Sequence, residues 1–226
     1  MKPPATWIIR LRAGACVAAI LLMSATSARA QIAGFTLRGF GDIGATTFTA
    51  DQSFDAILGS ATGKVFGGGV EVVLPSRLFA SVRASRFRES GERVFLFDGM
   101  QFDLGISTTI TVTPVQLSGG YRFRPFRRVR VFRRIVPYAA AGMGWYGFTE
   151  TSQFATDQER VADRFTGFHI LGGGEVALRR WLAVGGELQW ATVPGAIGDN
   201  ANSVAHEFNE TNLGGTTWRF KVVVGR

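Results

Sequence analysis

The two histidines are the side chains of this sequence best suited to proton transfer or metal binding near neutral pH. His169 is followed by Ile170 and Leu171, and His206 lies beside Glu207. A catalytic histidine needs a reacting partner within hydrogen-bond reach, and a metal site needs three or four ligands. Neither histidine stands in such a cluster along the chain. We therefore expect no enzyme, no cofactor and no metal, and we interpret His169 as a polar residue of the interior.

A second candidate set consists of charged residues that alternate with apolar ones. Near the end of the chain, for example, Arg219 and Lys221 alternate with Trp218, Phe220 and Val222. Buried unpaired charges are costly, whereas hydrogen-bonded ion pairs are tolerated, so acids and bases on one inward face should be nearly balanced. The face holds four acids and five bases, which we expect to form an interior charge network: Arg38, Asp42, Glu71, Arg83, Arg122, Glu175, Glu187, Arg219 and Lys221. Such a network predicts a structural plug, and its rearrangement could alternatively gate a narrow conductance.

Residues 1–30 resemble a secretory signal peptide. Lys2, Arg10 and Arg12 give a positive start, residues 13–23 are apolar, and Ala28-Arg29-Ala30 is a small-residue cleavage site before Gln31. Removal of this segment would also remove the only cysteine and four of the 25 basic residues, while all 17 acids remain. We therefore expect an exported domain over residues 31–226 without disulfides, and no binding to nucleic acid.

Alternation with a period of two runs through residues 31–226 and predicts β-strands whose two faces meet different surroundings. Eight such segments can be distinguished; the alternation is clearest near the end of the chain, from Trp218, and further strands are expected at about residues 35–49, 108–123 and 136–149. In the central strands Ile110, Val112 and Pro114 fall on the nominally polar face, which suggests either a β-bulge or an error in the assigned register there.

The connections between these segments alternate in length. Residues 75–77 and 179–181 are tight turns, whereas residues 50–63, 88–107, 150–166 and 194–212 are long and polar. Outer-membrane barrels have an even number of strands, short periplasmic turns and longer extracellular loops. The pattern predicts an all-β fold, an eight-stranded antiparallel up-and-down transmembrane β-barrel with both ends in the periplasm.

The direction of the apolar face separates two classes of protein. In a soluble exported β-barrel that carries a small apolar ligand, the apolar face would point inward. In a membrane barrel it points toward lipid, and the enclosed space is only just wide enough for side chains. We favour the membrane barrel because the polar face is nearly balanced in charge, and we expect interface aromatics near strand ends: Tyr121, Phe123, Tyr138, Tyr146, Trp190 and Trp218.

The segment from Pro137 to Trp145 and the run Gly172-Gly173-Gly174-Glu175 resemble the OmpA/OmpX-type family of small bacterial outer-membrane β-barrels. Gly215, Trp218 and Phe220 are similar to the last-strand signal that the barrel-assembly machinery recognises, although the chain ends on Arg226 instead of an aromatic residue. The resemblance implies a location in the bacterial outer membrane. It also implies three partners, namely membrane lipid, lipopolysaccharide and the barrel-assembly machinery.

The connection between the fourth and fifth predicted strands is unusually basic. We expect a periplasmic turn that could bind phosphate through its six arginines, Arg124, Arg127, Arg128, Arg130, Arg133 and Arg134.

The function predicted from sequence is therefore a non-enzymatic outer-membrane barrel with a plugged polar interior. It would serve envelope integrity or surface interaction through four long loops, whose extracellular partner the residues do not identify. The alternatives are a narrow diffusion pore of the same fold and the soluble carrier.

Overall fold

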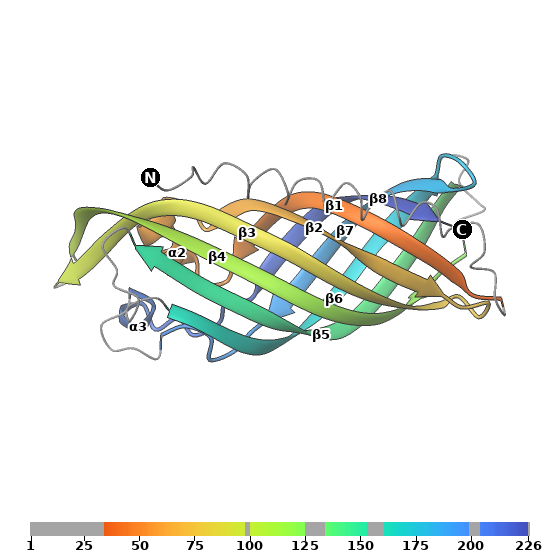
Figure 1. Cartoon of the computed structure of the whole chain (residues 1–226). Coiled ribbons are helices and arrows are strands. Elements are labelled where there is room, and N and C mark those ends of the chain that lie inside the picture. The colour runs from red at the N-terminus through yellow and green to blue at the C-terminus, as the bar shows by residue number, and fades with distance from the viewer. Residues whose placement is uncertain (1–33, 98–99, 125–133, 153–160, 199–203, 226) are drawn as a thin grey trace, which may run out of the picture.

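Eight antiparallel strands close into a barrel in the computed structural model, which describes residues 34–97, 100–124, 134–152, 161–198 and 204–225 (Figure 1). Each strand pairs with its neighbours in sequence, and β1 also pairs with β8 to close the sheet. The strands are β1 (Thr36–Phe48), β2 (Thr62–Val73), β3 (Leu78–Phe97), β4 (Met100–Arg122), β5 (Ile135–Ser152), β6 (Val161–Ala177), β7 (Leu182–Thr192) and β8 (Gly215–Gly225). The predicted all-β, eight-stranded antiparallel architecture is confirmed.

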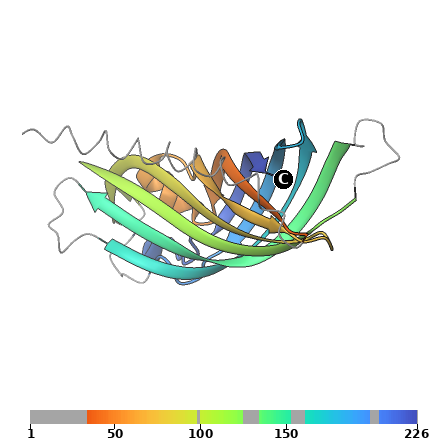
Figure 2. The same ribbon diagram turned by 45° about the vertical axis from the view of Figure 1, so that its right-hand side comes forward.

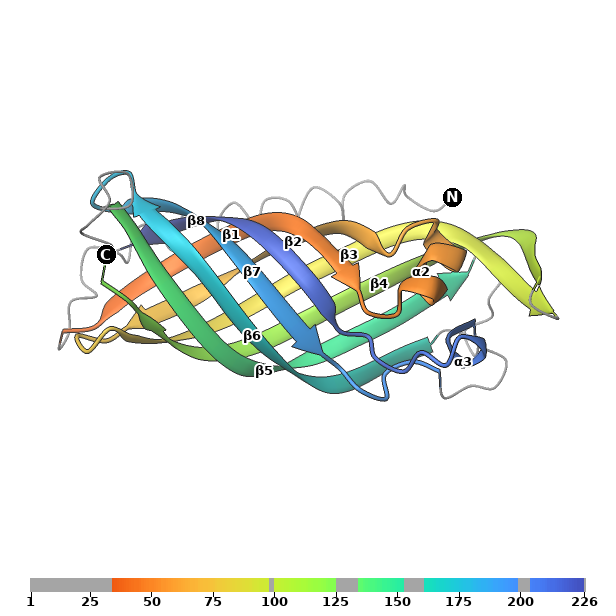
Figure 3. The same cartoon turned by 180° about the vertical axis from the view of Figure 1, so that it is seen from behind.

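The two ends of the barrel differ. The start of β1, the end of β8 and the tight turns lie at one end, which we call the turn end; the other is the loop end (Figures 1 and 3). Two short helices, α2 (Asp51–Leu58) and α3 (Val204–Glu207), lie at the loop end. Within the part of the chain that the structure describes, no helix is long and apolar enough to cross a membrane.

The strands run obliquely around the barrel (Figure 2), so neighbouring backbones approach closely. Glycine permits this approach at several points of contact. A Cβ atom on Gly44 would lie 1.9 Å from the carbonyl oxygen of Trp218, and one on Gly142 would lie 2.0 Å from that of Leu117. The high glycine content of the strands therefore follows from the tight curvature of a small barrel.

Large apolar side chains cover the outside of the barrel. Trp218 keeps 59% of its surface exposed and Trp190 keeps 50%, whereas Glu187 and Lys221 on the opposite face are buried. The exposed set includes Ile43, Phe66, Val82, Leu117, Trp145, Phe168, Ile170, Leu188, Trp190, Trp218 and Phe220. A soluble carrier would keep its apolar side chains inside and its charges outside, whereas here large apolar side chains cover the exterior and charged residues are buried in a filled interior, so that alternative is wrong.

The expectation of a β-bulge or a register error around Ile110, Val112 and Pro114 is also wrong. The pairing of β4 with β5 is continuous through these residues, and Ile110 and Val112 are buried inside the barrel. They face inward because the interior itself becomes apolar toward the loop end. The register shift lies farther along the hairpin, between Glu92 and Val94.

Two of the predicted interface aromatics are interior residues instead. Tyr138 and Tyr146 are 3% and 5% exposed, because each lies on the inward-facing parity of β5. Their hydroxyl groups find partners there: Tyr138 donates to Glu187, and Tyr146 accepts a hydrogen bond from Gln116. Phenolic rings with a satisfied hydroxyl suit a mixed polar interior as well as a membrane interface.

Much of the predicted loop 88–107 is strand. β3 and β4 continue their pairing from Arg88 opposite Thr111 to Phe97 opposite Met100, so this hairpin projects beyond the other strands (Figure 1). Hydroxyl groups pair across it, as in Ser90 Oγ and Thr109 Oγ1 at 2.9 Å. Residues 88–93 are polar or glycine and residues 94–97 are all apolar, so the alternation that marks a strand is absent from this part of β3.

Candidate functional site

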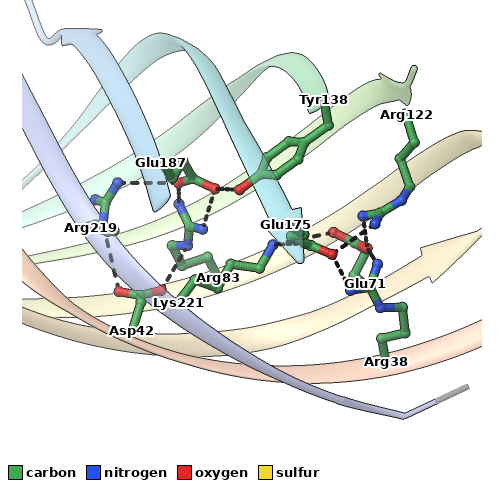
Figure 4. Close-up of polar contacts among 10 residues, drawn as sticks. All are labelled: Arg38, Asp42, Glu71, Arg83, Arg122, Tyr138, Glu175, Glu187, Arg219 and Lys221. Carbon is green, nitrogen blue, oxygen red and sulfur yellow. Dashed lines mark hydrogen bonds and ion pairs between the residues drawn. The ribbon is translucent and has the colours of Figure 1, made fainter. Parts of the chain in front are cut away.

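The interior between the turn end and the middle of the barrel is filled by charged side chains from seven of the strands. All nine residues predicted for the charge network lie there, and their ion pairs join strands that are distant in sequence (Figure 4). They form two groups: a turn-end ion group of Arg38, Glu71, Arg122, Glu175 and Lys221, and a central ion group of Asp42, Arg83, Glu187 and Arg219.

In the turn-end ion group, two guanidinium groups bridge the same two carboxylates. Arg38 donates from Nη1 to Glu71 Oε1 at 2.9 Å and from Nη2 to Glu175 Oε2. Arg122 repeats this pattern, with 3.2 Å to Glu71 Oε1 and 2.7 Å to Glu175 Oε2. Lys221 Nζ lies 3.1 Å from Glu175 Oε1 and 3.6 Å from Glu71 Oε2. Each carboxylate thus meets three cations.

The central ion group is built around Glu187 on β7. Arg83 on β3 forms a bidentate pair with Glu187, in which the bond from Nη2 to Oε2 measures 3.0 Å. Tyr138 donates to the same Oε2 at 3.0 Å. Asp42 lies 3.2 Å from Arg83 Nε and 3.6 Å from Arg219 Nε. Bidentate arginine–carboxylate pairs fix geometry as well as charge.

Two aromatic rings connect the ion groups. Lys221 Nζ lies 4.6 Å from the centroid of Phe40 and 5.0 Å from that of Tyr138, and the guanidinium carbon of Arg83 lies 5.1 Å from the Phe40 centroid. These distances are within the range of cation–π attraction. The network is therefore continuous along the barrel axis.

The network is almost fully withdrawn from solvent. The side chains of its ion pairs are 0–12% exposed. Five bases face four acids, and the single excess positive charge belongs to the turn-end ion group. Breaking one partner of such a pair leaves an uncompensated buried charge, which costs about 3–5 kcal/mol. The arrangement can hold strands together and block the passage of ions.

A neutral polar layer separates the central ion group from the loop end. Arg219 Nη1 donates to Gln189 Oε1 at 2.7 Å, and Gln116 Nε2 donates to Tyr146 at 2.8 Å. His169 is buried, with Nε2 2.8 Å from Ser118 Oγ. The cavity beside this layer measures about 40 Å³, room for only a few water molecules.

Between that layer and the loop end, the interior is filled by an apolar cluster, which the alternation pattern of the sequence did not predict. Phe48, Phe54 and Phe87 form its centre, with ring centroids 4.1 Å apart for Phe48 and Phe54 and 4.9 Å apart for Phe48 and Phe87. Its other members include Ile110, Val112, Phe148, Val193 and Leu213. Phe54 belongs to α2, so this helix closes the loop end from inside.

The helix α2 is fastened by a residue from the connection between β7 and β8. Its N-cap residue, Ala50, supplies no side-chain hydrogen bond. Instead, Glu210 accepts hydrogen bonds from the backbone N–H groups of Gln52 at 3.1 Å and Ser53 at 2.9 Å, and from the Ser53 hydroxyl. A carboxylate at a helix N-terminus satisfies free donors and suits the helix dipole. Nothing in the local spacing connects Glu210 with residue 53, which explains why sequence reasoning missed it.

The remaining predicted site residues lie apart from the network. Arg124 and Arg134 are exposed at the turn end, whereas Arg127, Arg128, Arg130 and Arg133 lie outside the described residues. In β8, Gly215 faces inward and Trp218 and Phe220 face outward. His206 lies in α3, where Nδ1 is 2.9 Å from the carbonyl oxygen of Gly198. Among the residues that the structure describes, no group of three or more His, Cys, Asp or Glu side chains could hold a metal ion.

Comparisons with known proteins agree with this architecture. A family model for the outer membrane protein beta-barrel domain matches residues 15–224. The solved structure of Neisserial surface protein A is similar at 12% identity, with a TM-score of 0.52 over 86% of this chain and 98% of that one. A major outer membrane protein from Thermus thermophilus is similar at 9% identity, with a TM-score of 0.55 over 84% of this chain and 98% of that one. No curated protein matches the chain.

The two solved structures share the fold, and the family model covers almost the whole sequence. The predicted resemblance to small outer-membrane barrels and the predicted location are confirmed. The chain belongs to the outer membrane protein β-barrel domain family, and its eight strands span the bacterial outer membrane.

Proposed function

We propose that the protein is a closed, non-enzymatic barrel that serves envelope integrity or surface interaction, with the loop end facing outward from the cell. The observation that carries this proposal is the filled interior. Two ion groups, a neutral polar layer and an apolar cluster follow one another along the axis, and the last is closed by Phe54 of α2. A barrel filled in this way can anchor exposed loops rigidly without letting solutes leak across the membrane.

The absence of catalysis is part of the same proposal. The buried Ser118–His169 pair is the arrangement that most resembles a catalytic one, but His169 is only 2% exposed. A substrate would have to enter a packed interior to reach it. The pair is better explained as mutual satisfaction of two buried polar groups.

We propose three kinds of partner. The exposed apolar belt would contact the hydrocarbon of the membrane. Charged residues between this belt and the loop end would contact lipopolysaccharide. The outward-facing Trp218 and Phe220 of β8 present a side-chain pattern to the barrel-assembly machinery during insertion.

Planar-bilayer recording tests the closed state. The purified wild-type protein should show no discrete conductance steps, because an ion would have to displace several buried ion pairs. The matched variant Glu187→Gln removes the acid at the centre of the central ion group while preserving its shape. Wild-type steps that change with Glu187→Gln would contradict the closed barrel and support the narrow diffusion pore.

A further inference from the structure

Three basic side chains lie together on the outer surface of β2 and β3 near the loop end. Val65 and Phe87 are each 3% exposed and point inward, so Lys64, Arg86 and Arg88, their neighbours in sequence, point outward. The register pairs Val65 with Phe87 and Phe66 with Arg86, which places Lys64 beside Arg88 on the adjacent strand. We call Lys64, Arg86 and Arg88 the basic patch.

The charges of the basic patch are not neutralised by the described residues around them. Within the described ranges, none of the three side chains forms an ion pair or a side-chain hydrogen bond. Glu89 accepts a hydrogen bond from the backbone N–H of Lys64 at 3.4 Å, but it follows Arg88 directly and so points to the opposite face of the strand. Glu92 shares the outer face but lies four residues beyond Arg88, about 13 Å farther along the strand. Like charges placed opposite each other on neighbouring strands are destabilising unless an anion joins them.

The position of the basic patch along the barrel indicates which anion. Lys64 lies ten positions from Leu74, and Arg88 lies ten positions from Leu78; apart from Arg86, the outward positions between them are apolar or glycine. At about 3.4 Å per residue and a tilt of about 40°, ten residues rise by about 26 Å, close to the ~25 Å apolar band of an outer-membrane barrel. Lys64 and Arg88 therefore lie at the headgroup level of the leaflet around the loop end. Arg86 lies two residues closer to the turn end than Arg88, and its long side chain can extend to the same headgroup level.

We propose that the basic patch binds the phosphate groups of a phosphorylated glycolipid in the outer leaflet. This inference rests on the proposed function, which directs the loop end outward. Two guanidinium groups can each grip a phosphate with two hydrogen bonds, and the ammonium group of Lys64 adds a third cation. Thr111, which lies opposite Arg88 in the register, brings a hydroxyl group to the same face. The lipid phosphates supply the negative charge that the described residues around the basic patch do not.

Titration of the folded protein with fluorescent lipid A in zwitterionic detergent micelles tests this proposal. The probes are lipid A with its phosphates and the same lipid after dephosphorylation. The wild-type protein should prefer the phosphorylated form, and the preference should weaken with added salt. Each basic residue near a membrane surface contributes about a fivefold gain in affinity, so Lys64→Gln/Arg86→Gln/Arg88→Gln should lose about a hundredfold.

A matched triple variant at the turn end, Arg77→Gln/Arg179→Gln/Arg180→Gln, removes the same number of charges and should bind lipid A as the wild type does. Equal losses in both triple variants, or none in the variant of the basic patch, would overturn the inference. Folding is checked by the heat-dependent gel shift, and Arg88→Gln alone should lose about fivefold if the triple variant does not fold. Conductance of the wild type would contradict the closed barrel without affecting the lipid measurement, so the two failures are distinguishable.

Discussion

The two halves of the barrel interior are packed by opposite chemistry. Toward the turn end, two ion groups fill most of the space, beside a small apolar cluster of Phe79, Tyr138, Ala140 and Leu171, whereas toward the loop end aromatic and aliphatic side chains fill it as a conventional core. Both halves lie behind the same apolar exterior. The comparison shows that period-two alternation separates the lipid face from the interior but does not determine whether that interior is polar.

The two halves also differ in how they tolerate change. A buried ion group depends on every partner being present, because removing one charge leaves its partner buried without compensation. An apolar cluster loses stability in proportion to the atoms removed and the cavity left behind. Substitutions matched between the halves therefore separate the two modes of packing.

The largest effect is expected from Glu187→Gln. Arg83 and Arg219 would then share Asp42 alone, and the free energy of unfolding should fall by about 3–5 kcal/mol. Denaturant unfolding in detergent micelles, followed by tryptophan fluorescence, measures the change.

Two further variants sharpen this prediction. Glu92→Gln removes an exposed acid and should change the unfolding free energy by less than about 0.5 kcal/mol. The double variant Arg83→Met/Glu187→Met should lose less than the sum of its single variants, because neither leaves the other unpaired. Strict additivity would show that the ion pair is not coupled.

A smaller effect, about 3 kcal/mol, is expected from Phe87→Ala in the apolar cluster. The ring is 3% exposed and lies against Phe48 and Phe54, so truncation removes contacts and opens a cavity. Phe87→Leu, which keeps most of the volume, should lose less than half as much in the same unfolding experiment. If both variants were as stable as the wild type, the loop end would not be closed by packing.

The smallest effect is expected from Glu210→Ala, which removes the carboxylate at the N-terminus of α2. Loss of this cap should destabilise the helix locally by about 1 kcal/mol. Amide hydrogen exchange should become several times faster in α2 and stay unchanged in β7 and β8. Glu207→Ala, in the same connection, is the control, and equal exchange rates in both variants would exclude the capping role.

Strand number, strand order and the outward direction of Trp190, Trp218 and Phe220 could be predicted because alternation is a local property of the chain. Which of the inward charges pair with each other depends on the barrel register, for example Arg83 on β3 with Glu187 on β7. The placement of Tyr138 and Tyr146 inside could have been read from their parity in β5, but their residue type suggested an interface.

The loop end was harder to predict because its contacts are not local. Phe54, Ile57 and Leu58 have the i, i+3, i+4 spacing of one face of a helix, but only the folded chain shows that Phe54 stacks on Phe48. In the hairpin from Arg88 to Ser107, residues 88–93 are polar or glycine and residues 94–97 are all apolar, so the backbone pairing is not marked by period-two alternation. The basic patch was not singled out either, since its meaning depends on the height of Lys64 and Arg88 above the apolar belt.

The sealed interior is tested most directly by cysteine labelling with a small charged thiol reagent, in a chain from Gln31 onward that contains no other cysteine. Ser118→Cys places a thiol in the buried layer beside His169, and Arg77→Cys places one in the exposed turn between β2 and β3. In the folded protein, the thiol at position 77 should react readily and the thiol at position 118 should react only after unfolding. Comparable rates at the two positions in the folded barrel would show an open water path and contradict the account.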